Sequence, residues 1–252
     1  MTVTTAELGA ARVITWDRQE RRNAWDLTTM SEIAAEIEVA GRDEAVRMIA
    51  VRGAGGHFSA GDDLQAAIEA DTAAWTETIE AFQRMTRVVL AAPVPVVAVV
   101  DGVCVGGALE FAASCDLRLC SNRVRLITPE VGIGLVASNA GTLLLPEVLG
   151  ETAARELLLS GEERDADWAR EHGFATEMVA PGALDKRVRH WEQIFTRTSR
   201  DAVAATKAML NERFGQLLPA AMDRETQHCV RLFDEPDARE ALSAFSRERE
   251  SS

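Results

Sequence analysis

The sequence predicts an α/β fold, and three features of the chain indicate it. Short apolar runs of strand length alternate with helical stretches through the first two thirds of the 252 residues. Two of these strands end in glycine-rich turns that lead into helices, and the last third is mostly helical and highly charged. Alternating strands and helices imply right-handed crossovers between parallel strands, so we expect a parallel sheet followed by an all-helical extension.

The expected strands are short apolar runs bounded by turns. The most apolar of them is opened by Pro95 and ends in a glycine-containing turn. In chain order the strands are expected at residues 12–16, 46–51, 96–100, 117–119 and 124–127.

Helices are expected between these strands and through the last third. A charged turn at 18–23 leads to a helix at 28–40, and a further helix covers 108–115. Asp62 and Asp63 can cap a long helical stretch that continues to about residue 90. From about residue 153 the chain is mostly helical, with breaks expected near Gly173, Pro181, Pro219 and Pro236.

The net charge argues against a nucleic-acid binder. The chain has 40 Asp and Glu against 27 Lys and Arg, which gives a formal net charge of −13. Affinity for polyanions comes mainly from Lys and Arg, so no nucleic-acid partner is expected. With 47% hydrophobic and 27% charged residues, the composition is that of an ordinary soluble globular protein.

A cytoplasmic protein is expected, because the sequence shows no secretory or membrane-spanning pattern and its cysteines are typical of reduced thiols. Residues 1–11 lack the basic and apolar pattern of a secretory signal. The longest apolar run, 88–100, contains two prolines and is shorter than the roughly 18 residues of a membrane span, so no membrane partner is expected. The cysteines form no CxxC pair and are expected to be reduced core thiols: Cys104, Cys115, Cys120 and Cys229.

The two glycine-rich turns, 53–61 and 101–107, predict a ligand site. In parallel α/β folds ligands bind at the carboxyl ends of strands, and the helices that follow expose N–H groups that can hold an anion. Two such donors that converge would form an oxyanion hole. For either turn alone, the simpler explanation is that glycine only permits a tight turn.

Two glutamates lie beside these turns. Glu110 comes three residues after Gly107, and Glu130 follows Pro129. Each could simply cap a helix, since acidic residues favour the first turn on electrostatic grounds. Their joint placement beside the two turns favours a catalytic pair instead.

No motif in the chain predicts a metal or a redox cofactor. There is no HExxH motif or Cys/His cluster, and no GxSxG nucleophile motif. Residues 132–137 match the GxGxxG/A dinucleotide-binding motif, but Pro129 precedes the motif where a strand is required, so no dinucleotide site is expected. We therefore expect activity without a metal, nicotinamide or flavin.

Four blocks together resemble the enoyl-CoA hydratase/isomerase (crotonase) superfamily, and the resemblance extends from about residue 12 to 249. The blocks are 22–24 (RNA), 58–64 (FSAGDDL), 99–116 (VVDGVCVGGALEFAASCD) and 129–134 (PEVGIG). A fifth, 237–245, resembles the C-terminal helix of the family.

The resemblance implies a spiral of repeated strand-strand-helix units with a helical C-terminal extension. The core with the acyl-CoA site would comprise 1–195, and 196–252 would form an oligomerisation region that assembles a homotrimer or homohexamer. Apolar side chains of that region are expected to pack between subunits: Leu210, Phe214, Leu217, Leu218, Leu232, Phe233, Leu242 and Phe245.

The resemblance also implies an acyl-CoA substrate whose thioester carbonyl lies between the N–H groups of Asp62 and Gly107. Asp62 occupies a position where a small apolar residue is common, and its carboxylate would be unfavourable beside an enolate unless the side chain points away. The remaining implied binding residues are Arg22 and Ala24 near the CoA phosphates, Ala60, Asp63 and Leu64 along the adenine and pantetheine path, Ser138 near the reacting carbons, and Phe245.

Family members with glutamates at both the Glu110 and Glu130 positions are typically hydratases. By analogy, Glu110 would hold and deprotonate water, and Glu130 would give a proton to Cα. The expected activity is therefore enoyl-CoA hydratase. The alternatives are an enoyl-CoA isomerase, another acyl-CoA hydrolase or lyase, and a catalytically silent acyl-CoA-binding subunit.

Overall fold

The computed structural model describes residues 2–250, except for the side chains of Ser243 and residues 245–250. The strands are β1 (Val3–Leu8), β2 (Ala11–Trp16), β3 (Met48–Gly53), β4 (Val96–Val100), β5 (Val103–Val105), β6 (Leu117–Ser121), β7 (Arg125–Ile127) and β8 (Glu177–Val179). The α-helices are α1 (Leu27–Arg42), α2 (Leu64–Glu69), α3 (Thr72–Ala91), α4 (Gly107–Ser114), α5 (Gly141–Leu149), α6 (Glu151–Ser160), α7 (Ala166–Glu171), α8 (Leu184–Thr196), α9 (Arg200–Asn211), α10 (Leu217–Phe233) and α11 (Pro236–Glu250).

The main sheet has six strands in the order β1-β2-β3-β4-β6-β8. Every neighbouring pair is parallel except β1 with β2, and β5 and β7 form a separate parallel pair. The predicted parallel α/β fold is therefore confirmed. β1, β5 and β8 were not predicted. β1 is a largely exposed edge strand with little apolar signal, β8 has only three residues, and β5 is a three-residue strand inside the stretch expected to be a turn.

The helices differ from the prediction in several places, and α5 was not predicted at all, since helix was expected only from about residue 153. The long helix expected up to residue 90 is two helices, since α2 ends at Glu69 and α3 begins after Asp71, whose side chain accepts a hydrogen bond from the Ala74 N–H at 2.9 Å. The break expected near Pro219 was also wrong. Pro219 is the third residue of α10, where the first turn leaves N–H groups unpaired and a missing N–H costs little.

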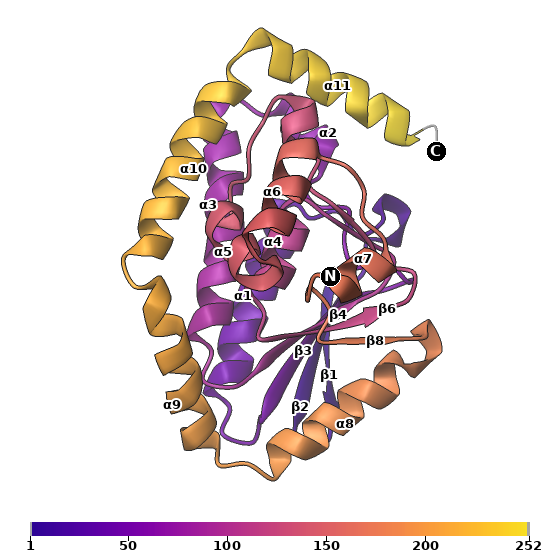
Figure 1. The fold of residues 1–252 in the computed structure, drawn as a ribbon, viewed down its shortest axis with the longest axis vertical. Coiled ribbons are helices and arrows are strands. Elements are labelled where there is room, and N and C mark those ends of the chain that lie inside the picture. Colours follow the sequence, from indigo (N-terminus) through magenta and orange to yellow (C-terminus); the bar gives the residue numbers. More distant parts are fainter. Residues whose placement is uncertain (1, 251–252) are drawn as a thin grey trace.

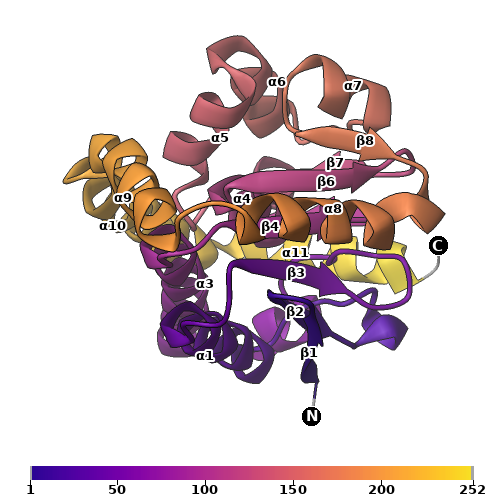
Figure 2. The ribbon, with the colours of Figure 1, turned by 90° about the horizontal axis from the view of Figure 1, so that it is seen from below.

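The sheet is covered on both faces, as a parallel sheet requires. β4 is buried along its whole length. Figure 1 shows α1 and α3 on one side of the strands and α8 on the other, and α8 contributes Leu184 and Val188 to the apolar layer on its side. Figure 2 shows α8 crossing in front of the strands. Within residues 2–250, no helix combines the length and apolar character needed to cross a membrane.

The C-terminal helices fold back on their own chain. α9 and α10 run along one side of the molecule, and α11 turns over its end (Figure 1). α10 contacts α3 and α5, and α11 contacts α2 and the short 3₁₀ turn η2 (Glu130–Ile133). Cys229 of α10 and Leu242 of α11 line one cavity with Gly61 and Gly107 of the two glycine-rich turns.

This packing corrects part of the expectation for the apolar C-terminal residues. Phe214, Phe233 and Leu242 are buried within the chain and need no neighbouring subunit. Leu210 and Leu217 remain 63% and 56% exposed. The oligomeric state and the division at residue 195 stay predictions, while the four cysteines are buried and unpaired, as expected.

We predict that Phe233→Ala loosens α10 and α11 from the core. The Phe233 ring is fully buried and stacks on Trp75 at 4.8 Å, so its removal should lower the free energy of unfolding by about 3–5 kcal/mol. Urea unfolding measures this change. Leu217→Ala, an exposed apolar residue of the same helix, should stay within about 0.5 kcal/mol of wild type, and an equally small effect of Phe233→Ala would contradict the packing described.

Candidate active site

The two glycine-rich turns meet at one cavity. The chain after β3 runs beside β5, where the Ser59 N–H donates to Val103 O and the Val105 N–H donates to Ser59 O, both at 3.1 Å. Gly61 has φ +85°, and a Cβ atom there would lie 2.6 Å from the Val105 carbonyl oxygen. Glycine is required at this position, because only glycine permits this close approach.

Two backbone N–H groups at this cavity donate to no described residue. The Trp25 N–H donates to Gly61 O at 2.8 Å and the Asp63 N–H donates to Trp25 O at 3.0 Å, so the intervening Asp62 N–H faces away from Trp25. Gly107 is the first residue of α4, so its N–H has no acceptor within the helix. Both residues line the cavity. This arrangement fits the oxyanion hole expected from the sequence.

The cavity is small and mostly apolar. Its volume of about 60 Å³ is enough for about two water molecules. Its apolar walls include Trp75, Ile79, Phe82, Val105, Ile133, Leu135, Val136 and Leu242, and its polar groups belong to Asp62, Thr78, Glu130, Ser138 and Cys229.

Glu130 faces this cavity from the start of η2. Its Oε2 atom is buried and has no hydrogen-bond partner in the part of the chain that the structure describes. Burial raises the pKa of Glu130 to about 7, and the charge of Glu225 adds to the increase. A carboxyl group that titrates near neutral pH can act as an acid or as a base.

Glu110 lies behind the cavity wall and is 1% exposed. Its Oε2 atom accepts hydrogen bonds from the N–H groups of Asn139 at 2.9 Å and Gly141 at 2.8 Å, whereas Oε1 accepts none from a described residue. Burial raises the pKa of Glu110 well above its usual value, as do the charges of Glu225 and Glu130. Because its hydrogen bonds go to a distant loop rather than to its own helix, helix capping does not explain this residue.

The loop at residues 139–142 is shared between Glu110 and Glu225, a buried residue of α10. Glu225 Oε2 accepts from the Ala140 N–H at 2.6 Å, and Oε1 accepts from the Thr142 N–H at 2.8 Å and from its hydroxyl at 2.5 Å. Four successive N–H groups therefore alternate between two carboxyl groups. Ala140 adopts φ +61°, a conformation that non-glycine residues seldom take, so the hydrogen bonds have to hold the loop in place.

The sequence analysis did not identify Glu225. An acidic residue in a charged helix is usually solvent-exposed, and its neighbours Asp223 and Arg224 are exposed. One signal was present: Met222, Glu225 and Cys229 have the three- and four-residue spacing of a single helix face, and both flanking members are apolar and buried.

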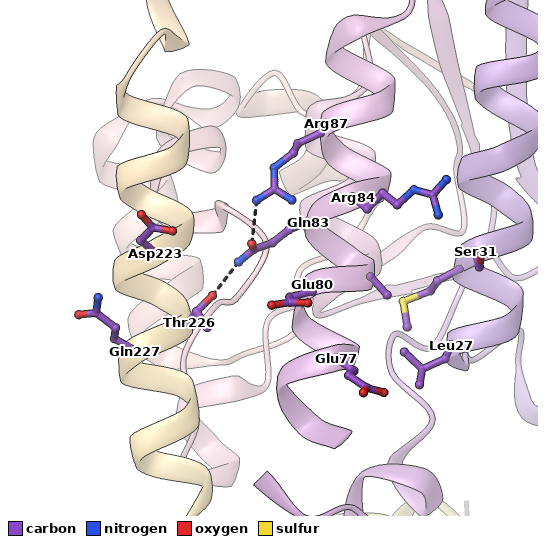
Figure 3. A pocket seen from close by; sticks show the side chains of 12 residues that line it. Leu27, Ser31, Glu77, Glu80, Gln83, Arg84, Arg87, Asp223, Thr226 and Gln227 are labelled. Carbon is purple, nitrogen blue, oxygen red and sulfur yellow. Dashed lines mark hydrogen bonds between the residues drawn. The ribbon is translucent and has the colours of Figure 1, made fainter. Parts of the chain in front are cut away.

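Gln83 of α3 supports the same loop from a second side. This residue is 4% exposed, and its Nε2 atom donates to Ser138 O and to Thr226 Oγ1, both at 2.9 Å. Arg87 donates to Gln83 Oε1 at 3.1 Å. Figure 3 shows Gln83 between Arg87 and Thr226, in the surface groove between α1, α3 and α10.

The structure brings together six of the residues predicted for the site. Lining the cavity are Ala60, Asp62, Leu64, Gly107, Glu130 and Ser138.

Besides Glu110, the predicted residues Arg22, Ala24 and Asp63 do not line this cavity. Arg22 lies beside the first turn, where its carbonyl oxygen accepts from the Ala60 N–H at 3.0 Å, and Ala24 is buried next to it. Asp63 is buried, and its carboxylate pairs with Arg18 at 2.9 Å and with Arg21 at 3.4 Å. The remaining one, Phe245, lies in α11, and its side chain is outside the described residues. Among the residues that are described, no group of three or more His, Cys, Asp or Glu is placed to hold a metal ion.

Comparison with known proteins gives one consistent family. Residues 8–252 match the model of the enoyl-CoA hydratase/isomerase family. The chain is 30% identical to the enoyl-CoA isomerase/hydratase fer4 of Mycosarcoma maydis, over 97% of this chain and 93% of the relative. It is 29% identical to the crotonyl-CoA hydratase of Syntrophomonas wolfei, over 92% and 90%. An enoyl-CoA hydratase structure from Bacillus halodurans superposes with a TM-score of 0.91 at 22% identity, over 97% of this chain and 100% of the other, and shows the same fold.

We predict that Glu225→Gln loosens the loop at residues 139–142. The amide can accept through only one oxygen, so at least one loop donor loses its partner, and hydrogen bonds to charged groups contribute about 1.5–3 kcal/mol each. The variant should unfold at lower temperature, and amide hydrogen exchange at residues 139–142 should speed up. Asp223→Asn, an exposed carboxylate of the same helix, should change neither. Unchanged exchange in Glu225→Gln would show that this carboxylate does not hold the loop.

Proposed function

Because this chain belongs to the enoyl-CoA hydratase/isomerase family, we propose that it is an enoyl-CoA hydratase that adds water reversibly across the 2,3 double bond of a 2-enoyl-CoA thioester. The observation that carries the proposal is the placement of two buried glutamates, Glu110 and Glu130, beside two N–H groups without acceptors. The names of the relatives from M. maydis and S. wolfei support the same reaction class.

The two N–H groups would activate the substrate. A thioester oxygen between Asp62 and Gly107 accepts both hydrogen bonds, which draws electrons from the conjugated double bond and makes Cβ electrophilic. When water adds, negative charge moves onto this oxygen as an enolate. Donors fixed in place for such a charge typically contribute about 10² to 10³ in rate each.

The two glutamates would move the protons. Water forms a C–O bond to Cβ and gives its proton to Glu110, whose Oε1 atom accepts no hydrogen bond from a described residue. Glu130 gives its proton to Cα, and the enolate returns to a thioester. Two neighbouring carboxyl groups titrate as a pair, and a single shared proton leaves one as the acid and the other as the base. The product is a 3-hydroxyacyl-CoA thioester.

One observation favours a second function, enoyl-CoA isomerase. Of the two glutamates, only Glu130 lines the cavity, while Glu110 is engaged with the loop at residues 139–142. Moving a double bond requires a single group that takes a proton from one carbon and returns it to another. Glu130, with a pKa of about 7, has the properties for that step.

We predict that Glu110→Gln and Glu130→Gln separate these two functions. If both residues serve hydration, each change should lower kcat for hydration by roughly 10² to 10⁴, with little loss of acyl-CoA affinity. The double variant should lose far less than the product of the single losses, because the pair acts as one unit. Hydration and double-bond migration are followed in parallel assays of each purified variant.

Glu171→Gln, an exposed carboxylate of α7, is the matched control and should keep wild-type rates. Hydration at wild-type speed in both site variants would refute the assignment of Glu110 and Glu130 as the acid-base pair. Loss of double-bond migration in Glu130→Gln alone, without any hydration by wild type, would establish the isomerase instead.

We also predict a preference for short acyl chains. A cavity of about 60 Å³ accommodates few atoms beyond the thioester, and its walls are closed by Trp75 and Leu242, which are 7% and 1% exposed. The kcat/KM for a four-carbon enoyl-CoA should exceed that for a ten-carbon one by at least about 10-fold. Leu242→Ala should reduce this ratio by opening the wall. Equal values for both chain lengths in wild type would contradict the prediction.

A further inference from the structure

Asp62 brings a second polar group to the cavity besides its N–H. Its carboxyl oxygen Oδ2 is buried and has no hydrogen-bond partner among the described backbone and side-chain atoms. The residue lines the same cavity as Gly107 and Glu130. A buried polar atom without a partner costs free energy, so a ligand that pairs with it gains affinity.

No Lys or Arg among the described side chains forms an ion pair with this carboxyl group. Arg18 and Arg21 pair instead with the carboxylate of the adjacent Asp63, at 2.9 Å and 3.4 Å. Burial and the negative charge of Asp63 raise the pKa of Asp62 to about 8. At neutral pH Asp62 is therefore mostly protonated, and it offers an O–H donor rather than a negative charge.

We propose that the protonated carboxyl group of Asp62 donates a third hydrogen bond to the thioester oxygen that the N–H groups of Asp62 and Gly107 hold. This inference rests on the proposed acyl-CoA activity. The carboxyl group is joined to the donor nitrogen only through Cα and Cβ, so an oxygen that accepts from the N–H of Asp62 lies within reach of the carboxyl group of the same residue. The neutral form is also the one compatible with a developing enolate.

The thioester oxygen is the expected acceptor for the O–H of Asp62, because it gains negative charge during the reaction. As the enolate forms, a neutral O–H donor binds its oxygen more strongly, and apolar surroundings can keep a carboxylic acid protonated for this purpose. The ionised form would instead repel the enolate. The expectation that an aspartate is unfavourable here therefore applies only at alkaline pH.

The pH dependence of kcat/KM tests the proposal. In wild type two groups lose their protons as the pH rises, Glu130 with a pKa of about 7 and Asp62 with a pKa of about 8. The value of kcat/KM should therefore fall by about tenfold per pH unit between pH 7 and 8 and by about a hundredfold per pH unit above pH 8. Asp62→Asn keeps a donor at every pH, so above pH 8 it should lose only about tenfold per unit, through Glu130. Asp62→Ala should show the same shallower loss and should be slower at pH 7 by roughly 10². Glu77→Gln, an exposed carboxylate of α3, should retain the wild-type profile. An unchanged loss of about a hundredfold per unit above pH 8 in Asp62→Asn would overturn the proposal.

Binding without turnover separates this inference from the proposed function. Calorimetry with butanoyl-CoA, which has the thioester but no double bond, should show wild type binding about fivefold more weakly at pH 9.5 than at pH 7, and Asp62→Asn binding equally at both. Free CoA should show no difference between the two proteins. If wild type binds butanoyl-CoA equally at both pH values, the inference about Asp62 is wrong but the proposed function stands. If butanoyl-CoA does not bind at any pH, the acyl-CoA site itself is rejected.

Discussion

The shared loop at residues 139–142 is the constraint on which the site depends. Its four N–H groups alternate between Glu110 of α4 and Glu225 of α10, so neither carboxyl group nor the loop can move alone. The same hydrogen bonds attach the C-terminal helices to the core of their own chain. They also bring Glu225 close enough to raise the pKa values of Glu110 and Glu130. The hydrogen bonds that attach the C-terminal helices to the core therefore also hold Glu225 where its charge raises the pKa values of the two glutamates proposed as the acid-base pair.

The buried carboxyl groups of the site lower the free energy of unfolding at neutral pH. Asp62, Glu110, Glu130 and Glu225 are all carboxyl groups with raised pKa values, and no ion pair with a Lys or Arg of the described chain compensates them. A carboxyl group whose pKa is higher in the folded state stabilises the protein below its unfolded pKa. That stability is lost as the pH rises through the folded pKa, here up to about 7 for Glu130 and about 8 for Asp62. The protons that folding retains on Glu130 and Asp62 are the ones that the proposed chemistry uses.

The sequence predicted the parts of the protein that depend on local patterns. Apolar runs identified β2, β3, β4 and β6, and the glycine-rich turns indicated a ligand site where two strands end. The N–H groups of Asp62 and Gly107 came from the family resemblance, and both residues line the cavity. It did not predict β1 or the break between α2 and α3, because an exposed edge strand and a two-residue interruption leave little hydrophobic signal. Glu225 was missed for a different reason. Its role depends on α10 folding back over a loop about 85 residues away, and no short-range pattern encodes such a contact.

The central claim is that this arrangement of two N–H donors and two glutamates adds water to an enoyl thioester. The most direct measurement is mass spectrometry of the product formed from crotonyl-CoA in D₂O, followed by exchange of its hydroxyl group back into H₂O. Hydration adds one water and leaves one deuterium at Cα, so the product should be heavier than the substrate by the mass of water plus one deuterium substitution. A product of unchanged formula that carries deuterium at carbon would show proton transfer without water addition and would contradict the account.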